Sequence, residues 1–265
     1  MTDMPEIHKG AYPFRLACPS FIYPAGYTDN VRRLGPVVDE IELLLFESGP
    51  GALPDNDEIN ELKRLGRTCD ITYNVHLPTD VAISHPDRSE QEAAIDALKS
   101  AIDRSLPLAP SSFTLHIPYT EPDTRPEQQR QWRKRVRAGA AGLLAGLPVG
   151  PRAIAVETLH YPFEFLEGII EEFDFSVCVD TGHIMACNHL CSPLYDQYRD
   201  RIPIIHIHGL LEERDHISLS HLTAPQAADL CHILCRIQTT VSLEVFSVDH
   251  LAASLDYLHF LWHNA

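Results

Sequence analysis

The stretch AIAVETL, residues 153–159, is a short apolar run that ends in a carboxylate, Glu157. Such a run, bounded by turn residues and rich in Val and Ile, is typical of a strand buried on both faces. A charged side chain is costly inside a buried strand, but it can bind a cation where the strand ends. Five further runs repeat the pattern: YNVHLP (residues 73–78), FTLHIP (113–118), VCVDTGH (177–183), IIHIHG (204–209) and SLEVFS (242–247).

Eight strand candidates alternate with helical patterns along the chain. They span residues 15–23, 40–47, 70–78, 112–119, 153–159, 175–180, 202–209 and 240–247. This alternation predicts an α/β fold, a (β/α)8 TIM barrel, as one domain over residues 1–265. A doubly wound open sheet is the alternative, but no Gly-rich phosphate fingerprint follows the first strand. Within the third helical pattern, residues 89–105, we expect Ser89 to be the N-cap.

The composition excludes some partners. The 265 residues carry a formal net charge of −16 at pH 7, whereas proteins that grip duplex DNA use clustered Lys and Arg. We therefore expect no nucleic-acid partner. No run of about 18 apolar residues occurs, so we expect no membrane span. The N-terminus lacks an apolar signal-peptide core and the seven cysteines are scattered, which favours a cytoplasmic protein with reduced thiols.

The polar residues at the strand ends are metal-ligand candidates. Six of them end the runs quoted above: His76, His116, Glu157, Asp180, His206 and Glu244. In a TIM barrel the C-terminal strand ends meet at one mouth, so we expect these side chains to converge. Carboxylates so close together would raise one another's pKa unless a cation lay between them. The mixture of imidazole and carboxylate favours Zn, Mn, Fe or Co over Mg or Ca.

A second group of candidates lies just beyond the strands. His183 follows Asp180 by three residues, and Arg214, Asp215 and His216 fall in the loop predicted after the seventh strand. The two histidines and Asp215 are expected to hold another metal or to bind a phosphate, and the alternative is an ordinary polar loop. Arg214 suits a bidentate contact with an anionic substrate.

Two residues are candidates for substrate contact. His208 lies two positions after His206, so it points to the same side but further out, which favours a supporting or substrate role over ligation. Glu47 ends the second predicted strand and is either a substrate contact or part of an ion pair at the barrel rim.

Together these motifs resemble the xylose-isomerase-like TIM-barrel superfamily, which includes endonuclease IV-type phosphodiesterases and sugar isomerases and epimerases. The resemblance extends from Phe14 to Trp262. In the nuclease-like members, matching positions imply three metal sites, with two or three divalent ions bound. The implied ligand sets are His76, His116 and Glu157; Glu157, Asp180, His206 and Glu244; and His183, Asp215 and His216.

One difference within the superfamily bears on function. The resemblance implies that epimerase-like members use only the Glu–Asp–His–Glu set, whose two glutamates transfer the proton. His76 and His116 therefore favour a multi-metal hydrolase. The nuclease pattern for the third site is Asp-x-His, whereas Asp215 and His216 are adjacent here, so Asp215 is the least secure ligand.

Several stretches are most similar to cobamide-remodelling phosphodiesterases. They are FIYPAGYTDNVRRLGPVVDEIELLLFES (residues 21–48), TYNVHLPTDV (72–81), HYPFEF (160–165), IIHIHG (204–209), RDHISL (214–219) and SLEVFS (242–247). The resemblance implies hydrolysis of a small-molecule phosphodiester, the nucleotide loop of a cobamide, to give a cobinamide and α-ribazole phosphate. The alternatives are a metal-dependent sugar isomerase or epimerase and an abasic-site endonuclease.

We expect the following division of labour in a phosphodiesterase. A metal pair bridged by Glu157 would lower the pKa of a bound water, and Glu157 or Glu244 would orient or deprotonate that water. His183, His208 and Arg214 would contact the phosphate or the leaving group.

Overall fold

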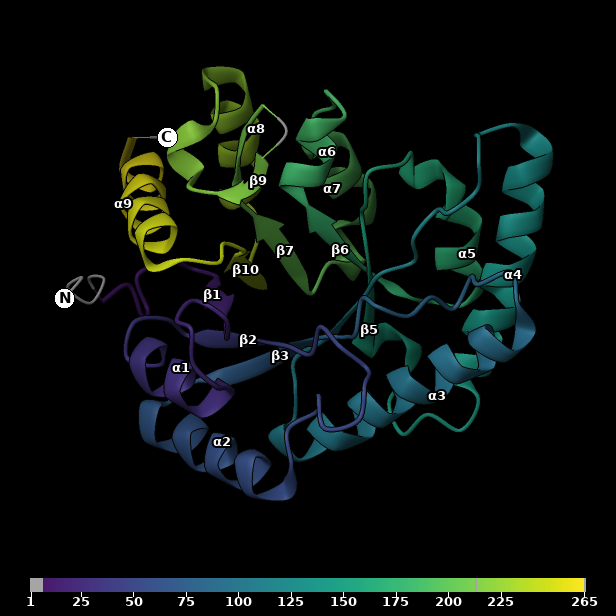
Figure 1. The fold of residues 1–265 in the computed structure, drawn as a ribbon. Coiled ribbons are helices and arrows are strands. Elements are labelled where there is room, and N and C mark those ends of the chain that lie inside the picture. The colour runs from purple at the N-terminus through teal and green to yellow at the C-terminus, as the bar shows by residue number, and fades with distance from the viewer. Residues whose placement is uncertain (1–6, 213, 265) are drawn as a thin grey trace.

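Eight parallel strands close into a barrel in the computed structural model, which describes residues 7–212 and 214–264 (Figure 1). In chain order the barrel strands are β1 (Arg15–Pro19), β2 (Glu40–Leu44), β3 (Thr72–His76), β4 (Phe113–Leu115), β5 (Ile154–Glu157), β6 (Ser176–Asp180), β7 (Ile204–Ile207) and β10 (Thr240–Leu243). Each strand pairs with its neighbour in sequence, and β1 pairs with β10 to close the ring. The predicted TIM barrel is confirmed.

The strands are shorter than the apolar runs that predicted them. The eighth run was expected to reach Ser247, but β10 ends at Leu243, and its register with β7 runs from Thr240 opposite Ile204 to Leu243 opposite Ile207. Residues beyond that point leave the ladder and turn toward the barrel mouth. The strand ends therefore carry polar side chains, while Ile, Val and Leu pack in the layer between the strands and the helices.

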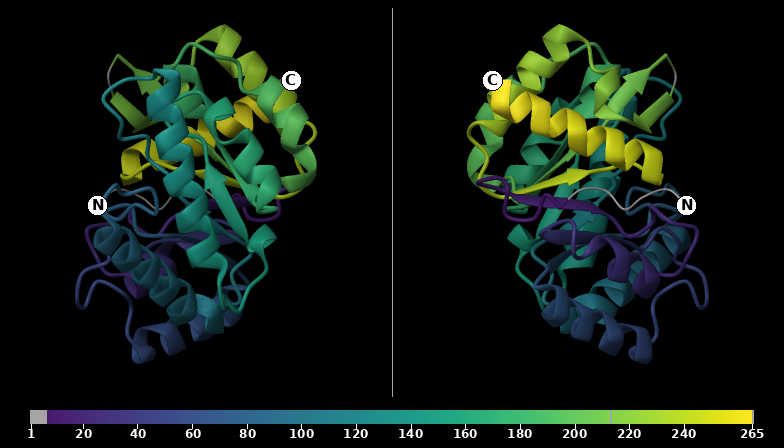
Figure 2. Two further views of the ribbon diagram at one scale, coloured as in Figure 1. Left: turned by 90° about the vertical axis from the view of Figure 1, so that its right-hand side faces the viewer. Right: turned by 90° about the vertical axis from the view of Figure 1, so that its left-hand side faces the viewer.

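Nine helices of the described chain surround the barrel. They are α1 (Tyr27–Leu34), α2 (Asn56–Cys69), α3 (Arg88–Ser105), α4 (Pro126–Leu144), α5 (Glu167–Glu172), α6 (Thr181–Ala186), α7 (Ser192–Tyr198), α8 (Ala224–Leu234) and α9 (Val248–Asn264). Both views of Figure 2 show them on the outside of the strands, where their apolar faces pack. None of the described helices is long and apolar enough to cross a membrane.

The expected cap of α3 is wrong by two residues. Asp87, not Ser89, is the N-cap, and its carboxylate accepts hydrogen bonds from the backbone N–H groups of Ser89 and Glu90. The acid satisfies two of the helix's unpaired donors and also interacts favourably with the positive end of the helix dipole.

A small antiparallel hairpin was predicted as a loop. Its strands, β8 (Gly209–Leu211) and β9 (Arg214–Ile217), follow β7 directly. Gly209 is needed here because a Cβ at this position would lie 2.0 Å from the carbonyl oxygen of Ser218. The hairpin holds residues 214–216 beside the barrel mouth instead of leaving them in an extended loop.

Candidate metal centre

The six strand-end candidates all converge at the C-terminal mouth of the barrel. His76, Glu157 and Asp180 are the last residues of their strands, His206 lies within β7, and the other two, His116 and Glu244, follow β4 and β10 by one residue. Five of the six are at most 4% exposed. The barrel closure thus brings together residues up to 168 positions apart, from residue 76 to residue 244.

Glu157 lies between two ligand sets and faces each with a different oxygen. Its Oε2 atom lies 2.8 Å from His116 Nε2 and 3.2 Å from His76 Nε2. Its Oε1 atom lies 3.5 Å from His206 Nδ1 and 3.7 Å from His183 Nδ1. The two predicted groups, His76–His116–Glu157 and Glu157–Asp180–His206–Glu244, each bring one ligand atom per residue within 4.8 Å of the others.

Hydrogen bonds orient the first pair of histidines. His76 Nδ1 lies 3.0 Å from the carbonyl oxygen of Leu77, so the proton belongs on Nδ1 and the lone pair of Nε2 faces Glu157. In the metal-free centre Nε2 can also be protonated: burial disfavours the charge, but the hydrogen bond to Glu157 outweighs it and raises the pKa of His76 to about 9. A cation that bound here would take the place of that proton.

The second set contains buried polar atoms without partners. Among the described residues no hydrogen bond reaches Asp180 Oδ2, His206 Nδ1 or Glu244 Oε2, although the last two atoms lie 3.0 Å apart. A buried polar atom without a partner is costly, whereas a cation placed among these atoms would satisfy all of them. The residues present therefore fit a bound metal ion.

Glu40 provides a comparison within the same barrel. It is also fully buried, but its carboxylate accepts from Thr72, Asn74 and Ser111 and pairs with Arg15 at 3.0 Å. Donors therefore surround this structural carboxylate, whereas Asp180 Oδ2 and Glu244 Oε2 at the mouth receive no hydrogen bond from the described residues.

The carboxylates of the centre stay ionised despite their burial. Burial raises the pKa of Glu157, but the charges of His116 and His206 oppose this and hold it well below its usual range. In Glu244 the same competition between burial and His206 lowers the pKa. In Asp180 burial is outweighed mainly by His208, and the pKa is again lowered. At neutral pH the centre is therefore rich in anionic ligands.

Glu42, which the sequence analysis missed, supports His206 from inside the barrel. Its Oε1 atom lies 2.9 Å from His206 Nε2, an ion-pair distance without hydrogen-bond geometry, and its Oε2 atom accepts a hydrogen bond of 2.6 Å from Ser242. This carboxylate–histidine pair leaves Nδ1 of His206 as the atom that faces the metal-ligand set. The sequence held a signal: Glu40 and Glu42 alternate within an apolar strand, so both must point into the barrel.

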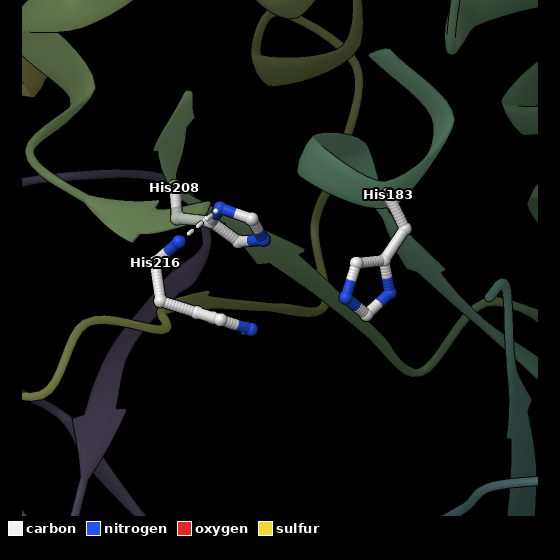
Figure 3. Close-up of side chains that lie close together, drawn as sticks. All are labelled: His183, His208 and His216. Carbon is white, nitrogen blue, oxygen red and sulfur yellow. Dashed lines mark hydrogen bonds between the residues drawn. The ribbon is translucent and has the colours of Figure 1, made fainter. Parts of the chain in front are cut away.

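The third group contains His183, His208 and His216, whose ligand atoms lie within 4.8 Å of one another (Figure 3). His183 donates from Nδ1 to the carbonyl oxygen of Thr158 at 3.0 Å. His216 donates from Nδ1 to that of Glu244, also at 3.0 Å. Both therefore repeat the arrangement of His76 and keep Nε2 available as a ligand.

His208 differs from these two histidines because both of its ring nitrogens are engaged. Its Nδ1 accepts from the backbone N–H of His216 at 3.0 Å, drawn as the dashed line in Figure 3. Its Nε2 donates to Asp180 Oδ1 at 3.2 Å. This geometry fits a residue that positions Asp180 better than a metal ligand.

The remaining candidates lie nearer to solvent. Asp215 belongs to a different group, with His160 and His183, and its Oδ2 atom is 3.9 Å from His160 Nε2. His160 was not among the predicted site residues, since it lies three residues beyond β5 in the mainly apolar stretch TLHYPFEF. Arg214 and Glu47 are exposed, and neither belongs to a ligand group of the described residues.

A family model described as a xylose isomerase-like TIM barrel matches residues 29–250. The chain belongs to this family. A comparison with curated proteins gives no significant match.

Three solved structures show how widely the fold of this family member is shared. A D-tagatose 3-epimerase-like protein superimposes with a TM-score of 0.78 at 12% identity, over 94% of this chain and 97% of that one. Endonuclease IV from Thermus thermophilus superimposes with a TM-score of 0.74 at 16% identity, over 95% of this chain and 100% of that one. D-psicose 3-epimerase from Clostridium cellulolyticum superimposes with a TM-score of 0.70 at 14% identity, over 93% of this chain and 99% of that one. At these identities the likeness concerns the fold alone.

Proposed function

We propose that this TIM-barrel protein is a metal-dependent phosphodiester hydrolase. The observation that carries the proposal is the position of Glu157, whose two oxygens face two separate ligand sets. A bridging carboxylate between adjacent cations is the arrangement of two-metal hydrolytic sites. A single metal would need only the Glu157–Asp180–His206–Glu244 set, so the second set with His76 and His116 supports a second cation.

The proposed metals are two or three divalent transition ions, from among Zn, Mn, Fe and Co. Imidazole nitrogens and carboxylate oxygens in mixed sets suit these ions better than the all-oxygen shells of Mg or Ca. Bound there, they would supply a water of lowered pKa and would neutralise charge on the phosphoryl oxygens.

Residues of the chain would orient the water and the phosphate and would transfer the protons. Glu244 offers one carboxylate oxygen to the metal-ligand set, and its other oxygen would hold the attacking water and accept its proton. The oxygen of that water forms the new bond to phosphorus, and the leaving alkoxide takes a proton from solvent or from His183. Arg214, exposed at the start of β9, would contact the phosphate from outside.

For the substrate we propose a small-molecule phosphodiester, the nucleotide loop of a cobamide, with α-ribazole phosphate as one product and with the protein in the cytoplasm. The similarity of the six stretches in the sequence supports this assignment, and the net charge of −16 argues against DNA. A metal-dependent epimerase is the second candidate, because the Glu157–Asp180–His206–Glu244 set is complete and contains two buried glutamates.

One set of incubations separates these functions. The metal-loaded protein is mixed with cobalamin, with abasic-site DNA, and with ketoses in deuterated water, and the products are identified by mass spectrometry. Release of α-ribazole phosphate supports the cobamide assignment. Deuterium incorporation at a sugar carbon without phosphodiester cleavage would replace the hydrolase with the epimerase, and nicked DNA alone would establish the endonuclease.

A further inference from the structure

A large cavity opens beside the metal centre, between the segments that follow β5 and β6. Its volume is about 720 Å³, within the range of small-molecule sites. Residues 158–167 form one wall, and residues 184–197 form the other. The HYPFEF stretch, residues 160–165, forms part of the first wall.

The cavity adjoins the metal centre through residues that contact both. Thr158 and His160 line it, and both also touch His183: the carbonyl oxygen of Thr158 accepts from His183 Nδ1, and the His160 and His183 rings lie 4.3 Å apart. Ile184, the residue after His183 on α6, also lines the cavity. A substrate whose phosphate reached the centre would have its adjoining group at this opening.

The residues that line the cavity indicate the polarity and charge of the group that fits there. Apolar side chains dominate, among them Phe163, Leu190 and Leu194, and Leu190 is 58% exposed although it is a large apolar residue. Among the described residues that line the cavity there is no lysine or arginine, whereas Glu164 and Glu167 contribute negative charge. A second phosphate would be repelled here, while an uncharged apolar group would be covered.

We propose that this cavity is the subsite for one ester group of the phosphodiester substrate, and that it takes an uncharged, planar aromatic or otherwise apolar group. The inference rests on the proposed function for the link to catalysis, but the cavity's preference for a neutral aromatic ligand is independent of it. A monosaccharide would fill only a small part of the volume and would leave the leucines exposed to water.

Binding tests the cavity without catalysis. The probe is 2-naphthol, a neutral fluorescent aromatic, titrated into metal-free protein, with 2-naphthoate as its anionic counterpart. We expect Leu190→Glu, which places a charge at an exposed position, and Leu194→Trp, which fills the cavity, each to weaken 2-naphthol binding at least about tenfold. The matched control is Phe260→Glu on α9, where an exposed phenylalanine outside the cavity receives the same charge. Unchanged binding in both cavity variants, or tighter binding of 2-naphthoate than of 2-naphthol, would overturn the proposal.

Catalysis tests the link to the metal centre. Bis(4-nitrophenyl) phosphate and methyl 4-nitrophenyl phosphate share a leaving group and differ only in the second ester group. We expect kcat/KM to favour the aryl diester, and Leu190→Glu to reduce that preference at least about tenfold while Phe260→Glu keeps it. If the wild-type protein showed no preference for the aryl diester, or if Leu190→Glu left that preference unchanged, the subsite proposal would be rejected. The proposed hydrolase function would not be affected by that result. If the protein hydrolysed neither of these diesters nor cobalamin with any of the metals, the proposed hydrolase function would be rejected. The binding of 2-naphthol would then be the only test of the cavity's ligand preference.

Discussion

Replacing Glu157 by glutamine is the sharpest test of the two-set arrangement. The amide keeps the size of the side chain but offers one oxygen instead of two. Oε2 faces His76 and His116 at 3.2 and 2.8 Å, and Oε1 faces His206 at 3.5 Å. Whichever way the amide turns, one set receives an NH2 group, which cannot ligate a metal. Both sets also lose the negative charge.

The size of the effect follows from the burial of the site. Removing one partner from a buried charge interaction costs about 3–5 kcal/mol, and Glu157 is only 1% exposed. At about 1.4 kcal/mol for each tenfold change, the metal dissociation constants should rise roughly 10²- to 10⁴-fold. Phosphodiester turnover should disappear together with the bound metal.

The assay is metal stoichiometry by plasma mass spectrometry after dialysis, with calorimetric titration of the metal-free protein. His76→Ala and Glu244→Gln are the comparison variants, because each belongs to only one of the two sets. We expect each to weaken one binding step and Glu157→Gln to weaken both. The bridging assignment would be refuted if Glu157→Gln affected a single step, or if its affinities stayed within about threefold of wild type. Circular dichroism of the metal-free variants controls for folding.

Three further predictions concern the surroundings of the centre. Glu42→Gln should weaken metal binding about 10- to 100-fold without removing a ligand, because Glu42 orients His206 at 2.9 Å; equal affinity by calorimetry would contradict this. Gly182→Ala should destabilise the protein by about 1–3 kcal/mol in denaturant titration, since a Cβ would lie 1.9 Å from His208 Cε1; an unchanged midpoint would show that the ring moves freely. When a chelator keeps the protein metal-free, the melting temperature should fall as the pH rises from 7 to 9.5. The pKa of His76 is about 9 in the folded protein and 6.5 in the unfolded chain. The protonated His76 therefore stabilises the fold by up to about 3 kcal/mol below pH 6.5, and this contribution is lost as the pH rises through 9. A flat profile in chelator, or the same fall in metal-loaded protein, would refute this.

The sequence was most informative where a buried strand ends in a polar residue. An apolar run that ends in Glu157 or Asp180 indicates two things. The strand is buried, and its C-terminal end lies at the barrel mouth that all the strands share. Parallel pairing then predicts that these residues meet at the mouth, and the resemblance to the superfamily implied how they divide into two ligand sets. Their grouping is visible in the structure, although which of them bind metal stays a prediction.

Unlike Glu42, two of the residues that were missed act through local contacts that leave no periodic signal. The roles of His160 and Thr158 depend on how the segment after β5 turns toward His183. The hairpin β8–β9 changed the third group in the same way, because it places the backbone N–H of His216 against His208. Side-chain spacing in an extended loop could not predict that contact, and the apolar cavity beyond it is likewise a product of loop packing.

The position of Glu157 also bears on why one fold could serve two chemistries. The Glu157–Asp180–His206–Glu244 set can hold a cation by itself, which leaves one oxygen of Glu157 free to accept a proton from carbon. If His76 and His116 held a second cation at that oxygen, Glu157 would have no free oxygen left to accept a proton from carbon. In our proposal these two histidines therefore do more than add a metal: they would remove the glutamate oxygen that an epimerase would need as a base, and the second oxygen of Glu244 would remain for water.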